Sequence, residues 1–108
     1  MARPLKPGLP ARGTSTGRPI MVLLDLLGRR WALRIIWELR HGPLSFRALQ
    51  AASENLSPSV LQTRLDELRQ ADIILLSDGY ALTPEGQALL QALIPLEIWA
   101  ENWGKRFD

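Results

Sequence analysis

The segment around Ser57 and Pro58 constrains the fold of this chain more than any other part of its sequence. A serine that caps a helix, followed by proline at the first helical position, is a strong helix-start signal. A helical wheel of residues 59–71 has an apolar side made of Leu61, Leu65 and Leu68. The opposite side carries Ser59, Gln62, Thr63, Asp66 and Gln70. We therefore predict an amphipathic helix that buries leucines and exposes hydrogen-bonding groups.

Helical patterns also precede this segment. Apolar residues recur at helical spacing over residues 20–27 and again over residues 32–39, and a glycine separates the two series. Gly42 and Pro43 end the second series, because glycine accepts a positive φ and proline cannot continue a helix. A short helix over residues 46–52 follows. A polar turn then joins this short helix to the one that starts after Ser57.

The C-terminal part predicts a hairpin and a long helix. Residues 73–76 and 80–82 indicate two short antiparallel strands, and Asp78-Gly79 between them favours a type I′ turn. A helix begins at Pro84 and keeps its apolar spacing to the end of the chain, although Pro95 is expected to bend or break it. This order of elements is that of a mainly α winged helix-turn-helix with a small β-hairpin.

The composition excludes several classes of function. The chain has 108 residues, no cysteine and one histidine, so thiol chemistry and sulfur-based zinc sites are absent. We find no glycine-rich phosphate loop and no catalytic constellation, and we expect neither an enzyme nor a cofactor or metal. The apolar stretches are shorter than the roughly 20 residues that span a bilayer, and no signal segment is evident. We expect a cytoplasmic protein without membrane contact.

The charges divide the chain into two regions. Residues 1–19 are rich in proline and glycine and contain four basic residues but no acidic one: Arg3, Lys6, Arg12 and Arg18. Residues 20–108 hold the other nine basic residues against all eleven acidic ones. We predict a flexible basic arm over 1–19 and one domain over 20–108 that ends in a dimerisation helix. The arm either follows nucleic-acid phosphates or is a solubilising extension.

The polar face of the helix after Ser57 has the chemistry of a DNA-reading surface. The Gln62 amide can form two hydrogen bonds with adenine, and small hydroxyl side chains can contact either base of a pair. The candidate base contacts are Ser57, Ser59, Gln62 and Thr63. The candidate phosphate contacts are Arg29, Arg30 and Arg47, which lie near helix starts. Arg64 falls toward the buried side of the wheel, so we expect it to pair with Glu38 or Glu67.

Two apolar helix faces exceed what so small a domain can cover by itself. One belongs to the first predicted helix and the other to the last. The candidate dimerisation residues are Leu23, Leu27, Leu96, Trp99, Trp103 and Phe107. A second copy would cover both faces, so we expect a homodimer. Its two DNA-reading helices would then lie about 34 Å apart and bind a near-palindromic operator in double-stranded DNA.

Five motifs together resemble the HxlR-type transcriptional regulators, a family related to the MarR type. They are Leu26–Trp31, Gly42-Pro43, Phe46–Leu49, Leu56–Pro58 and Leu82–Gly86. The resemblance covers about residues 20–104. It implies a homodimeric winged-helix regulator that binds DNA and dimerises through its terminal helices.

The chain departs from the family pattern in three places. Family members often have a sensing cysteine ahead of the first helix, and this chain has none. The family's wing is usually longer and basic, whereas here the tip is only Ser77, Asp78 and Gly79. Positions that are commonly cationic in the family's DNA-reading helix are Ser59 and Asp66 here.

Our interpretation is a sequence-specific DNA-binding transcriptional regulator, expected to be a repressor. The alternative is a winged-helix module that binds another protein through the same face and does not bind DNA. The acidic balance of residues 20–108 favours that alternative. Whether a small-molecule effector exists stays open at this point.

Overall fold

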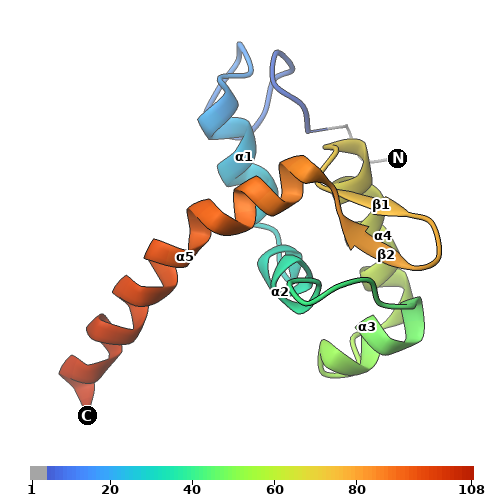
Figure 1. Cartoon of the computed structure of the whole chain (residues 1–108). Helices are drawn as coiled ribbons and strands as arrows, with labels where there is room; N and C mark the ends of the chain where they lie inside the picture. The colour runs from blue at the N-terminus through green and yellow to red at the C-terminus, as the bar shows by residue number, and fades with distance from the viewer. Residues whose placement is uncertain (1–4) are drawn as a thin grey trace.

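The computed structural model describes residues 5–108 and has the predicted winged helix-turn-helix architecture (Figure 1). Its elements, in chain order, are α1 (Pro19–Leu27), α2 (Ala32–Glu38), α3 (Phe46–Ala52), α4 (Pro58–Gln70), β1 (Ile74–Leu76), β2 (Tyr80–Leu82), α5 (Pro84–Gly104) and the 3-10 turn η1 (Lys105–Phe107). The predicted order of helices and hairpin is confirmed. No helix of the described part is long and apolar enough to cross a membrane.

Side-chain caps start three of the helices, as the sequence indicates. The Ser45 hydroxyl accepts a hydrogen bond from the Ala48 N–H at 3.1 Å, and the Ser57 hydroxyl accepts one from the Val60 N–H at 3.3 Å. Thr83 caps α5 in the same way through the Gly86 N–H at 2.9 Å. Each cap satisfies a backbone donor that would otherwise lack a partner in the first turn.

The core forms around the leucine side of α4. Residues of α4, α2 and α3 have no measurable exposure there: Leu61, Leu65, Leu68, Ile35, Ile36 and Leu49. α1 adds Val22 and Leu26, and the hairpin adds Ile74, Tyr80 and Leu82. The predicted burial of the α4 leucines is confirmed, so the polar side of α4 must face away from the body.

The hairpin differs from the prediction in its turn. β1 and β2 pair with Leu76 opposite Tyr80, which leaves a three-residue loop between them. Within this loop only Gly79 has a positive φ, of 135°, whereas a type I′ turn requires two such residues. The predicted type I′ turn is therefore wrong. Leu44 adds a bridge to Tyr80 through two backbone hydrogen bonds of 3.0 and 2.8 Å, which ties the segment before α3 to the hairpin.

The apolar face that the spacing predicts for α1, made of Ile20, Leu23, Leu24 and Leu27, is exposed only in part. Val22 and Leu26 point into the core. Ile20 and Leu24 are 52% and 53% exposed, while Leu23 and Leu27 are half-buried within the single chain. The apolar spacing of α1 admits two overlapping faces, and packing against the core selects one. Of the predicted α1 contacts, Leu23 and Leu27 are thus partly used inside the fold.

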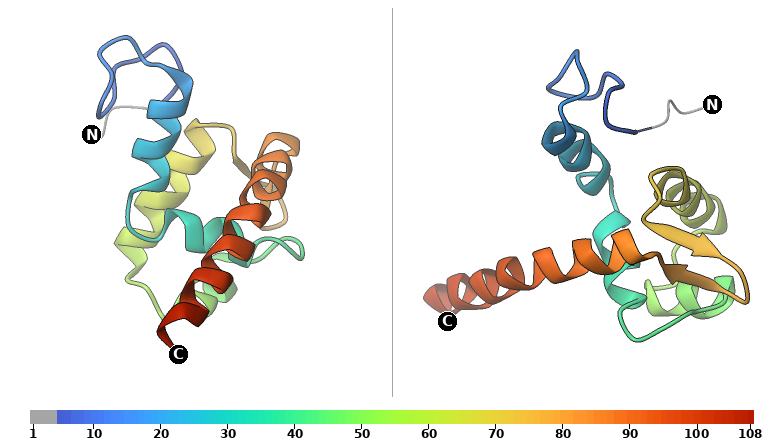
Figure 2. Two further views of the ribbon diagram at one scale, coloured as in Figure 1. Left: turned by 90° about the vertical axis from the view of Figure 1, so that its left-hand side faces the viewer. Right: turned by 45° about the horizontal axis from the view of Figure 1, so that its top comes forward.

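α5 is one continuous helix that leaves the body (Figure 1, Figure 2). The sequence predicts a bend or a break at Pro95, and the helix is not broken there. Proline removes the hydrogen bond to the Gln91 carbonyl, but both residues are exposed, so solvent can satisfy that carbonyl. Beyond Leu90 no residue of α5 is buried. The predicted contacts Leu96, Trp99, Trp103 and Phe107 are between 52% and 74% exposed.

The N-terminal segment is folded against α1, which differs from the flexible arm that its composition predicts. Leu5 is 6% exposed and belongs to the core. The Gly8 N–H donates to the Gly17 carbonyl at 2.9 Å, and the Arg12 N–H donates to Asp25 Oδ2 on α1 at 3.1 Å. Composition misses this packing because one anchoring leucine and a few hydrogen bonds hold it. Arg3 of the predicted basic arm lies outside the described residues.

Candidate nucleic-acid interface

The N-terminal half of α4 presents an uninterrupted polar face. Ser59, Gln62 and Thr63 are exposed, and Ser57 stands exposed at the cap. Because the Ser57 oxygen accepts the capping hydrogen bond, its O–H remains able to donate to a ligand. The four predicted base contacts therefore lie together at the N-terminal end of one helix.

Two of these side chains are held by their own helix. Gln62 Nε2 donates to Asp66 Oδ1 at 2.9 Å, and the Thr63 hydroxyl donates to the Ser59 carbonyl at 2.9 Å. An amide group has two N–H donors and one acceptor oxygen, so Gln62 keeps one donor and its oxygen free. A bidentate contact with adenine needs one donor and one acceptor. Asp66 can thus fix the orientation of Gln62 without blocking that contact.

The turn between α3 and α4 is built from left-handed backbone. Glu54 and Asn55 have φ values of 59° and 56°. The Asn55 N–H donates to the Gln50 carbonyl at 2.9 Å, and Gln50 Nε2 donates to the Leu56 carbonyl at 2.8 Å. Two successive left-handed residues reverse the chain within a few positions, and this reversal sets the angle at which α4 leaves α3.

Arg34 of α2 clamps this turn to the body. Its guanidinium donates to the Ala52 carbonyl at 2.8 Å, to Glu54 at 3.2 Å and to Glu38 at 2.7 Å. The hydrogen bond to Glu38, with the negative charges of both carboxylates, raises the pKa of Arg34 above its ordinary value. Arg34 is therefore a structural cation that supports the helix-turn-helix.

A buried carboxylate joins α4 to the loop that precedes α2. Glu67 is 8% exposed and accepts hydrogen bonds from Arg29 and from Arg64, the latter at 2.9 Å. Arg64 also donates to the Arg30 carbonyl at 2.8 Å. The predicted pairing of Arg64 with Glu67 is confirmed. Arg29, a predicted phosphate contact, is held by Glu67 and lies 3.9 Å from Asp25.

The other two predicted phosphate contacts are exposed. In the described part of the chain, neither Arg30 nor Arg47 has a carboxylate within 4.0 Å. Arg30 lies 5.8 Å from the ring centre of Trp31, whose φ of 79° is rare for a bulky residue. No residue pattern in the sequence predicts the left-handed Trp31, which shapes the loop that carries Arg29 and Arg30.

Arg69 is a cation that the sequence reasoning missed. It is exposed on α4 and lines a shallow hollow beside β1 together with Asp66. Its spacing of seven positions from Gln62 puts the two on one flank of the helix, and this spacing is the signal that could have found it. The hairpin loop contains Asp78 and no basic residue. Of the two arginines of α4, Arg69 is the one nearer to the hairpin in sequence.

Known proteins match most of this chain. The HxlR-like helix-turn-helix family matches residues 26–108. The HTH-type transcriptional regulator YvaP of Bacillus subtilis is 33% identical over 88 residues, which cover 74% of this chain and 82% of YvaP. YodB of the same organism, also an HTH-type transcriptional regulator, is 33% identical over 87 residues, covering 73% and 78% of the two chains.

Solved structures agree with these matches. The crystal structure of quinone-bound YodB superposes with a TM-score of 0.72 at 32% identity and covers 77% of this chain and 96% of YodB. A structure from Enterococcus faecalis V583, ascribed to the MarR family of transcriptional regulators, has a TM-score of 0.73 at 28% identity, with 89% and 94% covered. Relatives in sequence and in structure are thus helix-turn-helix regulators and not enzymes. This chain belongs to the HxlR-like helix-turn-helix family of transcriptional regulators.

Proposed function

We propose that this protein is a cytoplasmic homodimer that binds double-stranded DNA sequence-specifically through α4 and represses transcription. The observation that carries the proposal is the polar N-terminal end of α4. Ser57, Ser59, Gln62 and Thr63 are exposed there. Recognition helices of this fold reach base edges with their N-terminal residues, and these four side chains have the donors and acceptors to read them.

Two exposed arginines support the proposal that α4 faces DNA. Arg30 and Arg47 come from segments that precede α4 and are available to phosphate oxygens. Phosphate contacts supply most of the affinity of such proteins and fix their register on the duplex. Base reading by α4 and phosphate binding by the two arginines together form one interface.

The homodimer is supported by the exposed apolar side chains of α5. Trp99 and Trp103 stack at 5.7 Å, and Phe107 meets Trp103 edge to face at 5.4 Å, so the three rings form a continuous apolar ridge. Ile20 and Leu24 of α1 form a second exposed apolar site. Exposed ridges of this kind mark association surfaces. Two copies related by a two-fold axis would bury them, and residues 20–108 would then combine DNA binding with dimerisation.

The geometry of the proposed dimer supports repression. A dimer that places two α4 helices about 34 Å apart covers one face of the duplex over two successive major grooves. A protein bound across a promoter in this way excludes polymerase. Proteins that bind a near-palindrome with two-fold symmetry need no further partner for this effect.

A gel-shift assay on genomic fragments at two salt concentrations tests DNA binding. The full chain should retain a preferred fragment as salt rises, because base contacts are less sensitive to salt than phosphate contacts. Loss of all fragments in parallel would contradict sequence-specific reading.

The second candidate function is a winged-helix module that binds another protein. Asp66 on the outer face of α4 and Asp78 in the hairpin loop favour it, because the negative charges of both side chains repel DNA phosphates. Under this alternative no DNA fragment is retained at either salt concentration, although the chain is folded and dimeric by light scattering.

A further inference from the structure

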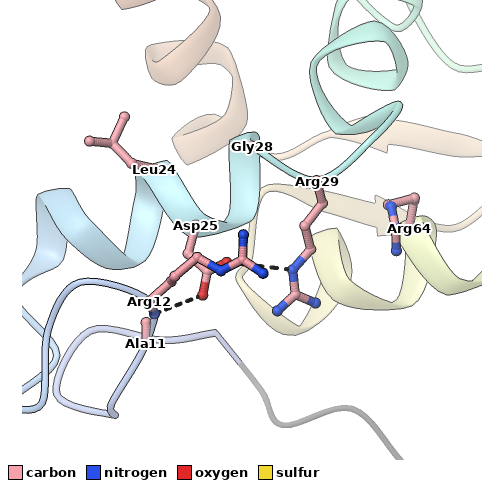
Figure 3. Close-up of a pocket in the computed structure, with 7 residues that line it drawn as sticks. All are labelled: Ala11, Arg12, Leu24, Asp25, Gly28, Arg29 and Arg64. Atoms are coloured by element: carbon pink, nitrogen blue, oxygen red, sulfur yellow. Dashed lines mark hydrogen bonds and ion pairs between the residues drawn. The ribbon is translucent and has the colours of Figure 1, made fainter.

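Three arginines from separate parts of the chain line one polar hollow. Arg12 comes from the N-terminal segment, Arg29 from the loop after α1, and Arg64 from α4. The hollow has a volume of about 710 Å³ and is open to solvent. Figure 3 shows Arg12 and Arg29 grouped around Asp25, with Arg64 further along on α4. The sequence separates the three by up to 52 positions, so folding alone creates this cluster.

Each guanidinium keeps donors that the protein does not use. Glu67 accepts from Nη1 of Arg29 and from Nη1 of Arg64, while Nε of Arg64 donates to a carbonyl. No hydrogen bond within residues 5–108 involves Nη2 of either residue. Over the same residues, Arg12 has no carboxylate within 4.0 Å of its side chain. A guanidinium has five N–H donors in a planar fork, so several donors remain for a ligand.

The charges favour an anion over a cation. Three guanidinium groups face two carboxylates, Asp25 and Glu67, so the cluster has an excess positive charge. Glu67 is itself buried between Arg29 and Arg64 and holds both in place. Asp25 accepts the Arg12 backbone N–H and thereby fixes the segment that carries Arg12. The two carboxylates thus hold the segments that line the hollow and leave the unused guanidinium donors available to a ligand.

We propose that this hollow is an oxyanion site, formed by Arg12, Arg29 and Arg64, for a phosphate or carboxylate group. Guanidinium forks match the oxygens of both groups with two parallel hydrogen bonds. The group is either a backbone phosphate of bound DNA or part of a free small molecule, and the chemistry of recognition is the same. The DNA source rests on the function proposed above, whereas the free-anion source does not.

The test compares Arg12→Ala with Arg18→Ala in the full chain. Arg18 is another exposed arginine of the same segment, and it does not line the hollow. The first arm titrates inorganic phosphate, and separately acetate, at constant ionic strength, with chloride as the reference anion and calorimetry as the readout. We expect saturable binding that Arg12→Ala weakens roughly tenfold, as loss of a charge-assisted hydrogen bond predicts, and that Arg18→Ala leaves unchanged.

The second arm measures the salt dependence of DNA binding. If the site takes a DNA phosphate, Arg12→Ala lowers the slope of log K against log salt by about one, and Arg18→Ala does not. If the site takes a free anion instead, Arg12→Ala weakens anion binding in the calorimeter, and the two variants have equal salt slopes in DNA binding. Equal behaviour of both variants in both arms overturns the proposal. If the wild type binds no DNA, the proposed function fails, and the phosphate titration still decides whether the oxyanion site exists.

Discussion

Replacing Glu67 with glutamine should destabilise the fold by about 1.5–3 kcal/mol, given the usual contribution of charge-assisted hydrogen bonds. Glu67 is 8% exposed and binds both Arg29 and Arg64, so its carboxylate joins α4 to the loop before α2. Glutamine has the same shape but one acceptor oxygen and no charge. Its NH₂ group would face at least one guanidinium, donor against donor.

The magnitude follows from the two lost interactions. Hydrogen bonds to charged groups contribute about 1.5–3 kcal/mol each, which sets an upper limit of roughly 3–6 kcal/mol for the pair. The side chains of Arg29 and Arg64 are 27% and 21% exposed, so water recovers part of the loss. Glutamine also retains one neutral hydrogen bond. About half of the upper limit remains.

Urea unfolding at a fixed protein concentration measures this difference. With a slope of about 1–2 kcal/mol/M for a chain of this size, the midpoint should fall by about 1–3 M. The control is Glu54→Gln, which removes the same chemistry from an ion pair whose carboxylate is 68% exposed. Exposed pairs contribute about 0–1 kcal/mol. Equal midpoint shifts for the two variants would refute the claim that burial gives Glu67 its role.

Three further predictions concern DNA reading, phosphate binding and the core. Gln62→Ala should weaken the free energy of DNA binding, measured by fluorescence anisotropy, by about 1–3 kcal/mol at the preferred operator and by much less on random DNA. Equal losses on both DNAs would remove Gln62 from the base contacts. Arg30→Ala should weaken all sequences alike and reduce the salt slope by about one, and an unchanged slope would remove it from the phosphate contacts. Ser53 is fully buried, and its hydroxyl has no partner within residues 5–108. Ser53→Ala should therefore raise the melting temperature by roughly 4 °C, as gain of about 1 kcal/mol predicts, whereas a lower melting temperature would show that the hydroxyl is satisfied.

The helices and their order could be predicted because their signals are local. Capping residues and prolines fix the starts of α4 and α5, and each signal involves only residues within one turn. The burial of Leu61, Leu65 and Leu68 follows from their spacing, and that prediction is confirmed. The exposure of Ser59, Gln62 and Thr63 is the other half of the same pattern.

Features that depend on distant residues were not predictable from one sequence. The packing of Leu5 in the core, the left-handed Trp31 and the pairing of Arg29 with Glu67 each need the whole fold. The partial burial of Leu23 and Leu27 was not predictable because the apolar residues of α1 are nearly continuous, and only the core decides that Val22 and Leu26 point inward. The turn of the hairpin depends on strand register, which the bridge from Leu44 helps to fix.

Selection of bound sequences from a random DNA pool tests the account most directly. The central claim is that two copies of α4 present the polar side chains around Gln62 to one duplex. The wild type should enrich an inverted repeat whose half-sites are about 10 base pairs apart from centre to centre. Gln62→Ala should enrich the same repeat with relaxed preference at one position of each half-site. No enrichment by the folded dimer, or an unchanged preference in Gln62→Ala, would contradict the claim.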